Sequence, residues 1–369
     1  MKKILIMNDH IYGGGVEKVM MNLVNHLPID KYKITILTNN YEQKFYDSYD
    51  ETVDYWYINK KLIKGTSILV RACNKVLRKI NNGKIKRLIK EEQFDIVIAI
   101  KEGPCMHFIS DLDAPKKIAW VHTDYDVLHW TKGFFKEGQE LNVMKKFNYI
   151  VCVSNKVKES VIKNVGDLGN LIFRANPLDE KYIQEKSKEE AIIDNLDHSP
   201  LFMSVGRLCK EKGFDMLLNV CQKLNINNYK YSLYIIGDGE YRELLENYID
   251  QNQLNNVKLL GLKNNPYKYL KHADWFISAS RAEGYALVTQ EAAILGIPII
   301  ATDCSGVKEL LGEDNKYGIV TEINEDSIYT AMAEVIENKN MQTYYKEKII
   351  ERSKIISISQ RMKDIEALF

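Results

Sequence analysis

The chain lacks paired cysteines, a strong charge of either sign and any long apolar run. Its six cysteines form no CxxC pair and show no framework spacing, so we expect reduced, buried thiols in a cytosolic protein rather than a disulfide scaffold. The formal net charge of +1 gives no overall attraction to nucleic acid, and no nucleic-acid partner is expected. No low-complexity segment and no repeat of solenoid period is found.

The apolar run nearest the start of the chain, Ile4 to Met7, is followed at once by polar Asn8-Asp9. Such a run is too short for a signal peptide and far too short to span a bilayer. We therefore expect a cytoplasmic protein, or one that lies peripherally on the inner face of the cell membrane.

Several catalytic motifs are also missing. There is no HxxxH, no DxD ahead of an apolar run and no Cys/His set, so no metal site is predicted. The chain has no G-x-S-x-G elbow and no Walker lysine either.

At 369 residues and 45% hydrophobic composition, the chain has the length for about two or three domains and enough apolar residues for two cores.

What the chain does contain is a regular alternation of β-branched runs and helical stretches, first in one half and then independently in the other. This alternation predicts an α/β fold with parallel, doubly wound sheets in two Rossmann-like domains. The strands expected are Lys3–Met7, Lys33–Thr38, Asp95–Ile100, Lys117–Val121, Tyr149–Val153, Leu201–Val205, Ser232–Ile236, Val257–Leu260, Trp275–Ala279 and Ile297–Ala301. The helices expected are Val16–Leu27, Ser67–Glu92, Phe214–Leu224, Tyr241–Gln253, Pro266–Leu270 and Ala286–Leu295.

The domain boundary is expected near Asn176-Pro177, ahead of a charged stretch without pattern. This gives an N-terminal domain over 1–175 and a C-terminal domain over 176–344, with a last helix over about 345–369 that packs back onto the first domain. Ligands of open α/β sheets bind at the carboxyl ends of the strands, so a cleft between the two domains is the expected site.

The segment from Glu283 to Glu291 holds two glutamates eight residues apart across a predicted helix start. Free backbone N–H groups of a first helical turn attract anions. A phosphate at that start, with a hydroxyl-binding carboxylate on either side, would suit a nucleotide sugar.

Three further turns of the second half follow predicted strands. In the first, Arg207 and Lys212 lie between Gly206 and Gly213, where they can face a diphosphate or can simply be solvated cations. In the second, Gly237 and Gly239 permit close approach of a ligand, although Asp238 can equally cap the next helix. In the third, Gly261-Leu262, backbone groups can contact the edge of a base, but a turn without a ligand role explains it equally well.

In the first half, Gly13-Gly14-Gly15 between a strand and a helix allows close ligand approach, but a plain tight turn explains it as well. It is not a G-x-G-x-x-G fingerprint, and a dinucleotide site is not predicted from it. His122 follows a predicted strand at its carboxyl end. The sequence supports a structural and a catalytic role of this histidine equally.

Taken together, these residues resemble a retaining glycosyltransferase of the GT-B fold, and the chain is most similar to family 4, also called glycosyl transferases group 1, of the bacterial surface-polysaccharide type. The likeness covers nearly the whole chain. It rests on several motifs in the expected order: Gly14-Gly15-Val16-Glu17, His122, Asn176-Pro177, Gly206-Arg207, Lys212-Gly213, Gly237-Asp238-Gly239, Glu283 to Glu291, Gly296-Ile297-Pro298, and Ser305-Gly306 with Glu309.

The resemblance implies roles for these residues. Arg207 and Lys212 would hold the donor diphosphate without a metal, and Glu291 would bind the ribose hydroxyls. Glu283 and His122 would contact the donor sugar, which makes Glu283, His122, Arg207 and Lys212 the expected catalytic residues. The expected donor-binding residues are Gly14, Gly15, Gly206, Arg207, Lys212, Gly237, Gly239, Leu262, Glu283, Gly284, Tyr285, Ala286, Leu287 and Glu291. Tyr285-Ala286 depart from the family, which often has Phe and then Gly or Pro after Glu-Gly.

A stretch from Lys60 to Lys90 contains eleven cations and no acid, with apolar residues at roughly helical spacing. A basic amphipathic face fits an anionic membrane surface or a lipid-diphosphate acceptor. A solvated, lysine-rich helix is an equal alternative.

The sequence and the resemblance therefore predict transfer of a hexosyl or N-acetylhexosaminyl unit from a nucleoside diphosphate sugar to a glycan or lipid-linked acceptor, in the making of a surface polysaccharide or glycoconjugate. UDP is the expected carrier because it prevails in the family, and no cofactor is expected besides the donor substrate. Two alternatives stay open. One is a nucleotide-sugar epimerase of the same fold, and the other is a non-catalytic partner subunit that binds a glycan or a sister enzyme.

Overall fold

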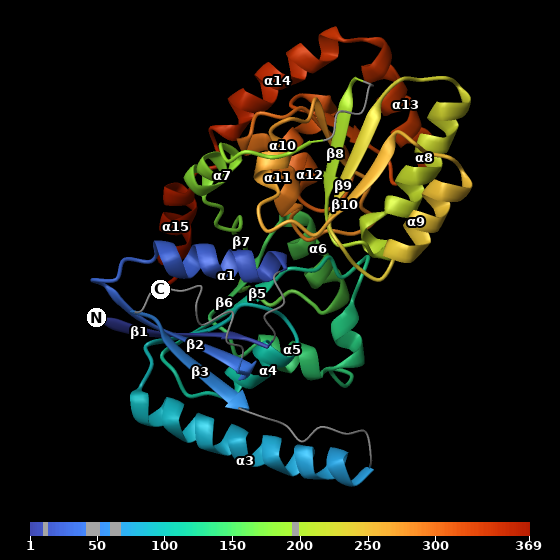
Figure 1. Cartoon of the computed structure of the whole chain (residues 1–369). Helices are drawn as coiled ribbons and strands as arrows, with labels where there is room; N and C mark the ends of the chain where they lie inside the picture. The colour runs from blue at the N-terminus through green and yellow to red at the C-terminus, as the bar shows by residue number, and fades with distance from the viewer. Residues whose placement is uncertain (10–13, 42–51, 60–67, 194–198) are drawn as a thin grey trace. The chain divides into compact units, whose positions relative to one another are not determined.

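The computed structural model describes residues 1–9, 14–41, 52–59, 68–193 and 199–369, with side chains of the helix at 68–92 described from residue 74. The described chain forms two compact units, one of Met1–Pro177 with Ser359–Phe369 and one of Leu178–Ile358 (Figure 1). Each unit is built on its own parallel sheet.

The first unit contains a seven-stranded sheet in the order β3-β2-β1-β4-β5-β6-β7, in which every pairing is parallel. Its central strands are continuous runs of fully buried aliphatic residues, as a sheet covered on both faces requires. The strands are β1 (Lys2–Asn8), β2 (Tyr32–Asn40), β3 (Asp54–Asn59), β4 (Ile96–Ala99), β5 (Lys116–Val121), β6 (Tyr149–Cys152) and β7 (Leu171–Phe173).

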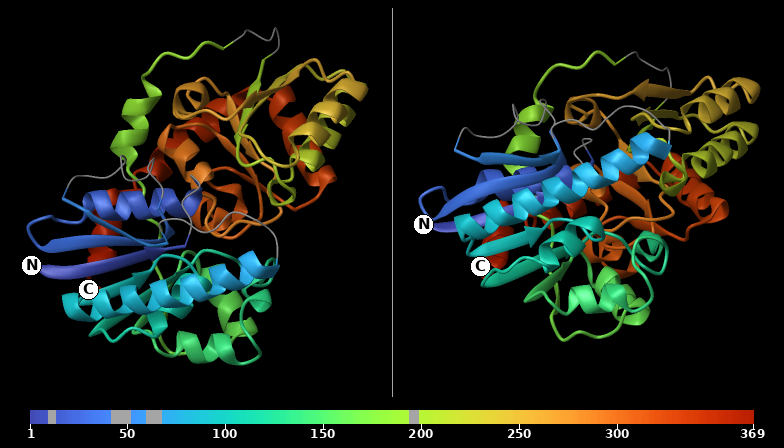
Figure 2. Two further views of the ribbon diagram at one scale, coloured as in Figure 1. Left: turned by 60° about the horizontal axis from the view of Figure 1, so that its bottom comes forward. Right: turned by 90° about the horizontal axis from the view of Figure 1, so that it is seen from below.

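Helices α1 and α3 lie on opposite faces of this sheet (Figures 1 and 2). Helix α1 buries Val19, Met20, Leu23 and Val24, and its first turn is closed by the carboxylate of Glu17, which accepts from the backbone N–H of Gly14 at 2.8 Å. The helices of the unit are α1 (Gly15–His26), α3 (Ile68–Glu92), α4 (Pro104–Ser110), α5 (Gln139–Met144), α6 (Asn155–Asn164) and α15 (Ile358–Glu366), with a 3-10 turn η1 (Trp130–Gly133).

The second unit contains a six-stranded parallel sheet in the order β10-β9-β8-β11-β12-β13. Its strands are β8 (Leu201–Val205), β9 (Ser232–Ile236), β10 (Val257–Gly261), β11 (Trp275–Ser278), β12 (Ile299–Thr302) and β13 (Ile319–Thr321). Its helices are α7 (Glu180–Ser187), α8 (Phe214–Ile226), α9 (Arg242–Gln251), α10 (Tyr267–Leu270), α11 (Leu287–Ile294), α12 (Val307–Leu311), α13 (Glu325–Glu337) and α14 (Asn340–Ser353), with 3-10 turns η2 (Lys210–Lys212) and η3 (Glu313–Asn315).

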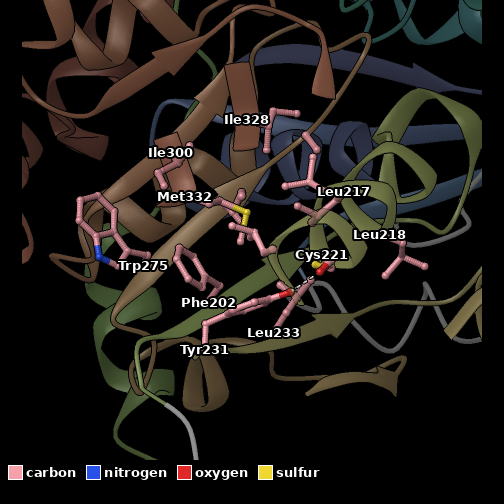
Figure 3. Close-up of a cluster of buried hydrophobic side chains, with 14 of the residues drawn as sticks. Phe202, Leu217, Leu218, Cys221, Tyr231, Leu233, Trp275, Ile300, Ile328 and Met332 are labelled. Carbon is pink, nitrogen blue, oxygen red and sulfur yellow. Dashed lines mark hydrogen bonds between the residues drawn. The ribbon is translucent and has the colours of Figure 1, made fainter. Parts of the chain in front are cut away.

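Neighbouring residues of the second sheet point into two separate cores, one on each face. Phe202 and Trp275 belong to one core, whereas Met203 and Phe276 belong to the other. Figure 3 shows the first core, where the hydroxyl of Tyr231 donates to the carbonyl oxygen of Cys221 at 3.0 Å. Burial raises the pKa of the Cys221 thiol to about 12, so this cysteine packs as a small apolar residue.

All ten expected strands are present, most within a residue or two of their expected ends, and the α/β prediction is confirmed. The sequence pattern missed β3, β7 and β13, of which β7 and β13 have only three residues each. The single helix expected over about 345–369 was wrong: α14 ends at Ser353 and a separate helix, α15, begins at Ile358. Only Ser359–Phe369 joins the first unit, where the aromatic ring of Phe369 meets that of Tyr32.

Candidate functional site

Four loops of the second unit follow strands that are neighbours in the sheet. Because β10, β9, β8 and β11 stand side by side and run parallel, their carboxyl ends share one edge. The loop after β8 carries Arg207 and Lys212, and the loop after β11 carries Glu283. Strands that are far apart in the sequence thus bring the expected donor-binding residues of this unit to one edge.

The glycines of these loops first serve to pack the loops against each other. Gly237 has φ of +149°, and a Cβ atom built there would lie 1.8 Å from the carbonyl oxygen of Gly206. A Cβ on Gly239 would lie 2.4 Å from the carbonyl oxygen of Leu208. A side chain is therefore excluded at both positions by the protein itself, whatever a ligand requires.

The ammonium group of Lys212 and the carboxylate of Glu283 form an ion pair across the two loops. The hydroxyl of Ser280 also donates to the Glu283 carboxylate, at 2.8 Å. The side chains of Lys212 and Glu283 are 21% and 16% exposed, so the pair is held by protein yet open to solvent. Arg207 lies on the same loop as Lys212 and is exposed. The sequence suggested separate tasks for Lys212 and Glu283 and did not suggest their pairing.

The turn that begins α11 is tightly built. Ala286 precedes the helix with φ of 36° and ψ of 57°, in the left-handed region that glycine adopts more readily. Tyr285 packs so closely on Gly306 that a Cβ there would lie 2.5 Å from the tyrosine ring, and Gln290 donates to the Tyr285 carbonyl oxygen at 2.8 Å. The backbone of Gly284 and Leu287 continues this turn on either side.

Glu291 lies in the second turn of α11 and is 0% exposed. The hydroxyl of Tyr267 donates to its Oε1 atom at 3.1 Å. Binding of ribose hydroxyls by Glu291 therefore requires a movement that uncovers it. Leu262, by contrast, is 75% exposed after β10.

In the first unit, His122 lies directly after β5, and its Nε2 atom is 2.9 Å from the carbonyl oxygen of Ile100. Since a carbonyl oxygen only accepts, Nε2 carries the proton, and a neutral ring presents Nδ1 as an acceptor. Burial lowers the pKa of His122 below its ordinary value of 6.5, against the opposing effect of nearby Glu102, so we take the ring as neutral at pH 7.

Glu102, which the sequence did not single out, organises the loop around His122. It is 1% exposed and accepts from the backbone N–H of His122 at 3.1 Å, the hydroxyl of Thr123 at 2.5 Å and the indole N–H of Trp130 at 3.0 Å. Burial favours the protonated acid, but the histidine and these hydrogen bonds outweigh burial and lower the pKa of Glu102. A glutamate three residues after the end of β4, followed by Gly103-Pro104, was the sequence signal that could have revealed it.

The other expected residues of the first unit are Gly14 and Gly15, which form the start of α1. Gly13 lies outside the described residues, as do Lys60, Lys61 and Lys64 of the basic stretch.

Within the described part of the chain, no group of three or more His, Cys, Asp or Glu residues could hold a metal ion. A hollow of about 540 Å³ near the carboxyl ends of β12 and β13 is lined by Asp303, Lys308, Glu313 and Glu322 among others, and includes none of the expected donor-binding residues.

Comparison with known proteins agrees with this architecture. The solved structure of Anabaena HepE in complex with UDP and glucose matches all of this chain and 99% of that one, with a TM-score of 0.76 at 15% sequence identity. Two parallel-sheet α/β units of this kind define the GT-B class of glycosyltransferases.

Family comparisons place the chain within that class. The family model of Glycosyltransferase Family 4 matches residues 13–171. The family model of Glycosyl transferases group 1 matches residues 185–352. The chain belongs to this family of glycosyltransferases, as the sequence motifs predicted.

Two curated relatives illustrate the family. An uncharacterized glycosyltransferase of Haemophilus influenzae is 28% identical over 337 residues, which cover 88% of this chain and 87% of the relative. The N-acetylgalactosamine-N,N'-diacetylbacillosaminyl-diphospho-undecaprenol 4-alpha-N-acetylgalactosaminyltransferase of Campylobacter jejuni is 32% identical over 182 residues, or 48% of each chain.

Proposed function

We propose that this protein transfers a hexosyl or N-acetylhexosaminyl unit from a UDP-sugar to a glycan or lipid-linked acceptor, with retention of configuration and without a metal. The observation that carries the proposal is the Lys212–Glu283 pair at the edge where β8 and β11 end. A cation for a leaving diphosphate and an anion for sugar hydroxyls stand there in direct contact. Transfer from a nucleotide sugar develops negative charge on the leaving diphosphate, which a cation stabilises, while a carboxylate can accept from sugar hydroxyls.

Lys212 and Arg207 would bind the diphosphate. An ammonium group has three donors, so Lys212 can keep one bond to Glu283 and give the others to phosphate oxygens. As the bond from sugar to phosphate breaks, negative charge grows on the leaving diphosphate, and fixed cations stabilise that charge more than they stabilise the bound donor. This supplies the electrostatic catalysis.

Glu283 and His122 would recognise the sugar. The Glu283 carboxylate can only accept hydrogen bonds, and so can the Nδ1 atom of a neutral His122. Both are thus suited to sugar hydroxyls rather than to another acceptor. We assign neither residue the role of nucleophile, and the leaving phosphate would take the proton of the acceptor hydroxyl.

The choice of donor and acceptor draws on the relatives. HepE was solved with UDP and glucose, and the Campylobacter relative is named for transfer of N-acetylgalactosamine to a diphospho-undecaprenol carrier. The first supports a UDP-linked donor for this chain, and the second supports an N-acetylhexosaminyl unit and a lipid-linked acceptor.

Donor hydrolysis and thermal shift across a panel of UDP-, GDP- and ADP-sugars would test the proposal. We expect one or a few UDP-sugars to raise Tm and to be turned over without added metal. Arg207→Ala and Glu291→Ala should each abolish transfer while the protein stays folded. Lys223→Ala, which removes an exposed ion pair with Glu325 in the same unit, is the matched control and should leave transfer unchanged. Full activity of both Arg207→Ala and Glu291→Ala would refute the site.

The two alternatives give different results in the same assay. An epimerase would release nucleotide or isomerised sugar at the same rate with and without an acceptor. A non-catalytic partner subunit would turn over no donor at all. The charged pair of Lys212 and Glu283 favours a catalytic protein, because a subunit without donor chemistry has no need of it.

We further propose that α3 docks the protein to the cytoplasmic face of an anionic membrane. Every residue from Lys75 to Ile80 is exposed, and these six residues combine cations with Val76 and Leu77, exposed by 58% and 36%, and with Ile80, exposed by 49%. Apolar side chains beside lysine and arginine are what an interfacial helix presents to anionic lipid. Within the described chain, no helix is long and apolar enough to cross a membrane.

Co-sedimentation with phosphatidylglycerol vesicles would test this second proposal. Lys75→Glu, Arg78→Glu and Lys79→Glu together should reduce vesicle binding at least about tenfold, since each surface cation contributes about 1 kcal/mol to attraction by anionic lipid. The matched control is Lys339→Glu, Lys346→Glu and Lys354→Glu, three exposed lysines of the second unit. Equal binding by both triple variants would refute the role of α3.

A further inference from the structure

Arg281 joins the two loops that carry the charged pair. Its guanidinium donates to both carboxylate oxygens of Asp215, at 2.6 and 2.8 Å, and to the carbonyl oxygen of Lys210 at 2.9 Å. Its backbone N–H and that of Ala282 both donate to the carbonyl oxygen of Glu211, at 2.7 and 3.3 Å. One dipeptide of the loop after β11 thus makes three hydrogen bonds to the loop after β8 and two more to Asp215, in the first turn of α8.

These bonds lie directly beside the charged pair in both loops. Glu211 precedes Lys212, and Ala282 precedes Glu283, so the contact between the loops is followed one residue later by the ion pair. The loops also pack closely behind it, where a Cβ on Gly213 would lie 2.0 Å from the carbonyl oxygen of Ala279. The position of the Lys212 ammonium relative to the Glu283 carboxylate is therefore determined by how the two loops are joined.

A bidentate arginine–carboxylate pair is suited to this task. Two parallel hydrogen bonds fix both distance and orientation, which a lysine cannot do with a single point of charge. The Arg281 and Asp215 side chains are only 30% and 35% exposed, so the pair is shielded on most sides. Arg281 does not need to touch a ligand to control where the neighbouring charges stand.

We propose that Arg281, through Asp215, is a positioning residue that holds Lys212 and Glu283 in register for transfer. The inference rests on the proposed function, because that function assigns Lys212 to the donor diphosphate and Glu283 to the sugar hydroxyls. Without the arginine, the cation and the anion remain, but the loops that carry them shift relative to each other. Displacement of catalytic groups by about 1 Å can reduce a rate about a hundredfold.

The test compares Arg281→Ala, Arg281→Lys, Asp215→Ala and the double alanine variant with the wild type, on the UDP-sugar that the wild type uses. We expect Arg281→Ala to lower kcat about 10- to 100-fold while the donor KM changes about threefold or less, because Lys212 still attracts the diphosphate. Asp215→Ala should match it, and the double variant should be no slower than either. Arg281→Lys should fall between wild type and Arg281→Ala.

Hydrogen exchange gives a measurement that is independent of activity. The amides of Arg281 and Ala282 should lose protection in Arg281→Ala, and the loss should be confined to the two loops. Lys223→Ala is the matched control, because it removes an ion pair from α8, the helix that contains Asp215, without touching either loop. It should leave both kcat and protection unchanged.

The outcomes separate the two hypotheses. An active wild type whose Arg281→Ala variant has the same kcat per folded molecule overturns the positioning role and leaves the proposed function intact. A wild type that turns over no nucleotide sugar overturns the proposed function. In that case unchanged hydrogen exchange in Arg281→Ala would also overturn the proposal that Arg281 holds the two loops together. Lost protection would show that Arg281 joins the loops as a structural feature of the fold.

Discussion

Glu102 and Glu283 occupy corresponding places in the two units and are used differently. Each follows a strand of its sheet, β4 or β11, and each accepts from a nearby hydroxyl, that of Thr123 or that of Ser280. Glu102, however, is 1% exposed and is satisfied by two N–H groups and that hydroxyl, whereas Glu283 stays partly exposed and meets an ammonium group.

This difference teaches how to separate a structural carboxylate from a functional one. A buried carboxylate whose hydrogen bonds all come from its own loops holds those loops together and has little capacity left for a ligand. A partly exposed carboxylate that is paired with a cation, such as Glu283, can exchange partners when a ligand arrives. We expect Glu102 to matter for stability and Glu283 for the reaction.

The largest effect should come from removing the charge of Glu283 or Lys212. Glu283→Gln keeps the size of the side chain, and Lys212→Met keeps most of its length. Each should lower kcat/KM for the nucleotide sugar about 100- to 1,000-fold, as the loss of one electrostatic contact in a transition state commonly does. Urea unfolding should show a small change, about 1 kcal/mol, because both side chains are near the surface.

Glu102→Gln is the matched comparison for that experiment. It removes the same charge from the other unit and should lower stability more than it lowers kcat per folded molecule. The contrast between the two carboxylates is wrong if Glu283→Gln retains half of the wild-type rate, or if Glu102→Gln abolishes activity without loss of stability.

The next effect in size concerns Glu102 and stability alone. Glu102→Ala leaves two buried N–H groups and a hydroxyl without their acceptor, which should lower the free energy of unfolding by about 3 kcal/mol. Denaturant unfolding followed by tryptophan fluorescence measures this, since Trp130 is one of the donors. Glu92→Ala, which removes a half-exposed ion pair with Lys3 in the same unit, should cost about 0.5 kcal/mol. Equal losses in both variants would contradict the central role of Glu102.

The sequence predicted the sheets better than the site. Long runs of β-branched residues, such as those of β1 and β9, identify buried strands by themselves, whereas the three-residue strand β13 is too short to show a pattern. The Lys212–Glu283 pair could not be foreseen, because it depends on β8 lying next to β11, two strands that the chain connects only through β9 and β10. The motifs located both residues without revealing the contact between them.

Burial is the other property that the sequence did not supply. The family resemblance assigned Glu291 to the ribose hydroxyls, and nothing in the sequence indicated that the fold covers this side chain fully and pairs it with Tyr267. Glu102 drew no attention because a lone glutamate after a strand resembles any surface acid. Both cases depend on neighbours from other elements of the fold, which no local pattern records.

A smaller effect should appear in the pH dependence of stability in the first unit. The pKa of His122 is lowered from 6.5 in the folded chain, so the unfolded chain takes up its proton first as pH falls. The stability linked to His122 is therefore complete above pH 6.5 and decreases below it. The Tm of the wild type should fall more steeply between pH 7.5 and 5.5 than that of His122→Asn. Parallel curves would show that the histidine titrates normally.

The smallest effect concerns the backbone at Ala286, and it sharpens the comparison because this residue begins the helix after Glu283. A left-handed alanine carries strain of about 1 kcal/mol that glycine does not, while its buried methyl group contributes a similar stabilisation. Ala286→Gly should thus leave the free energy of unfolding nearly unchanged. Ala292→Gly, inside the same helix, gains nothing in strain and loses both packing and helix propensity, so it should be at least about 1 kcal/mol less stable than Ala286→Gly. If differential scanning calorimetry finds the two variants equally destabilised, residue 286 does not adopt a left-handed conformation in solution. The first turn of α11 would then begin with a different backbone geometry from the one given by φ of 36° and ψ of 57° at Ala286.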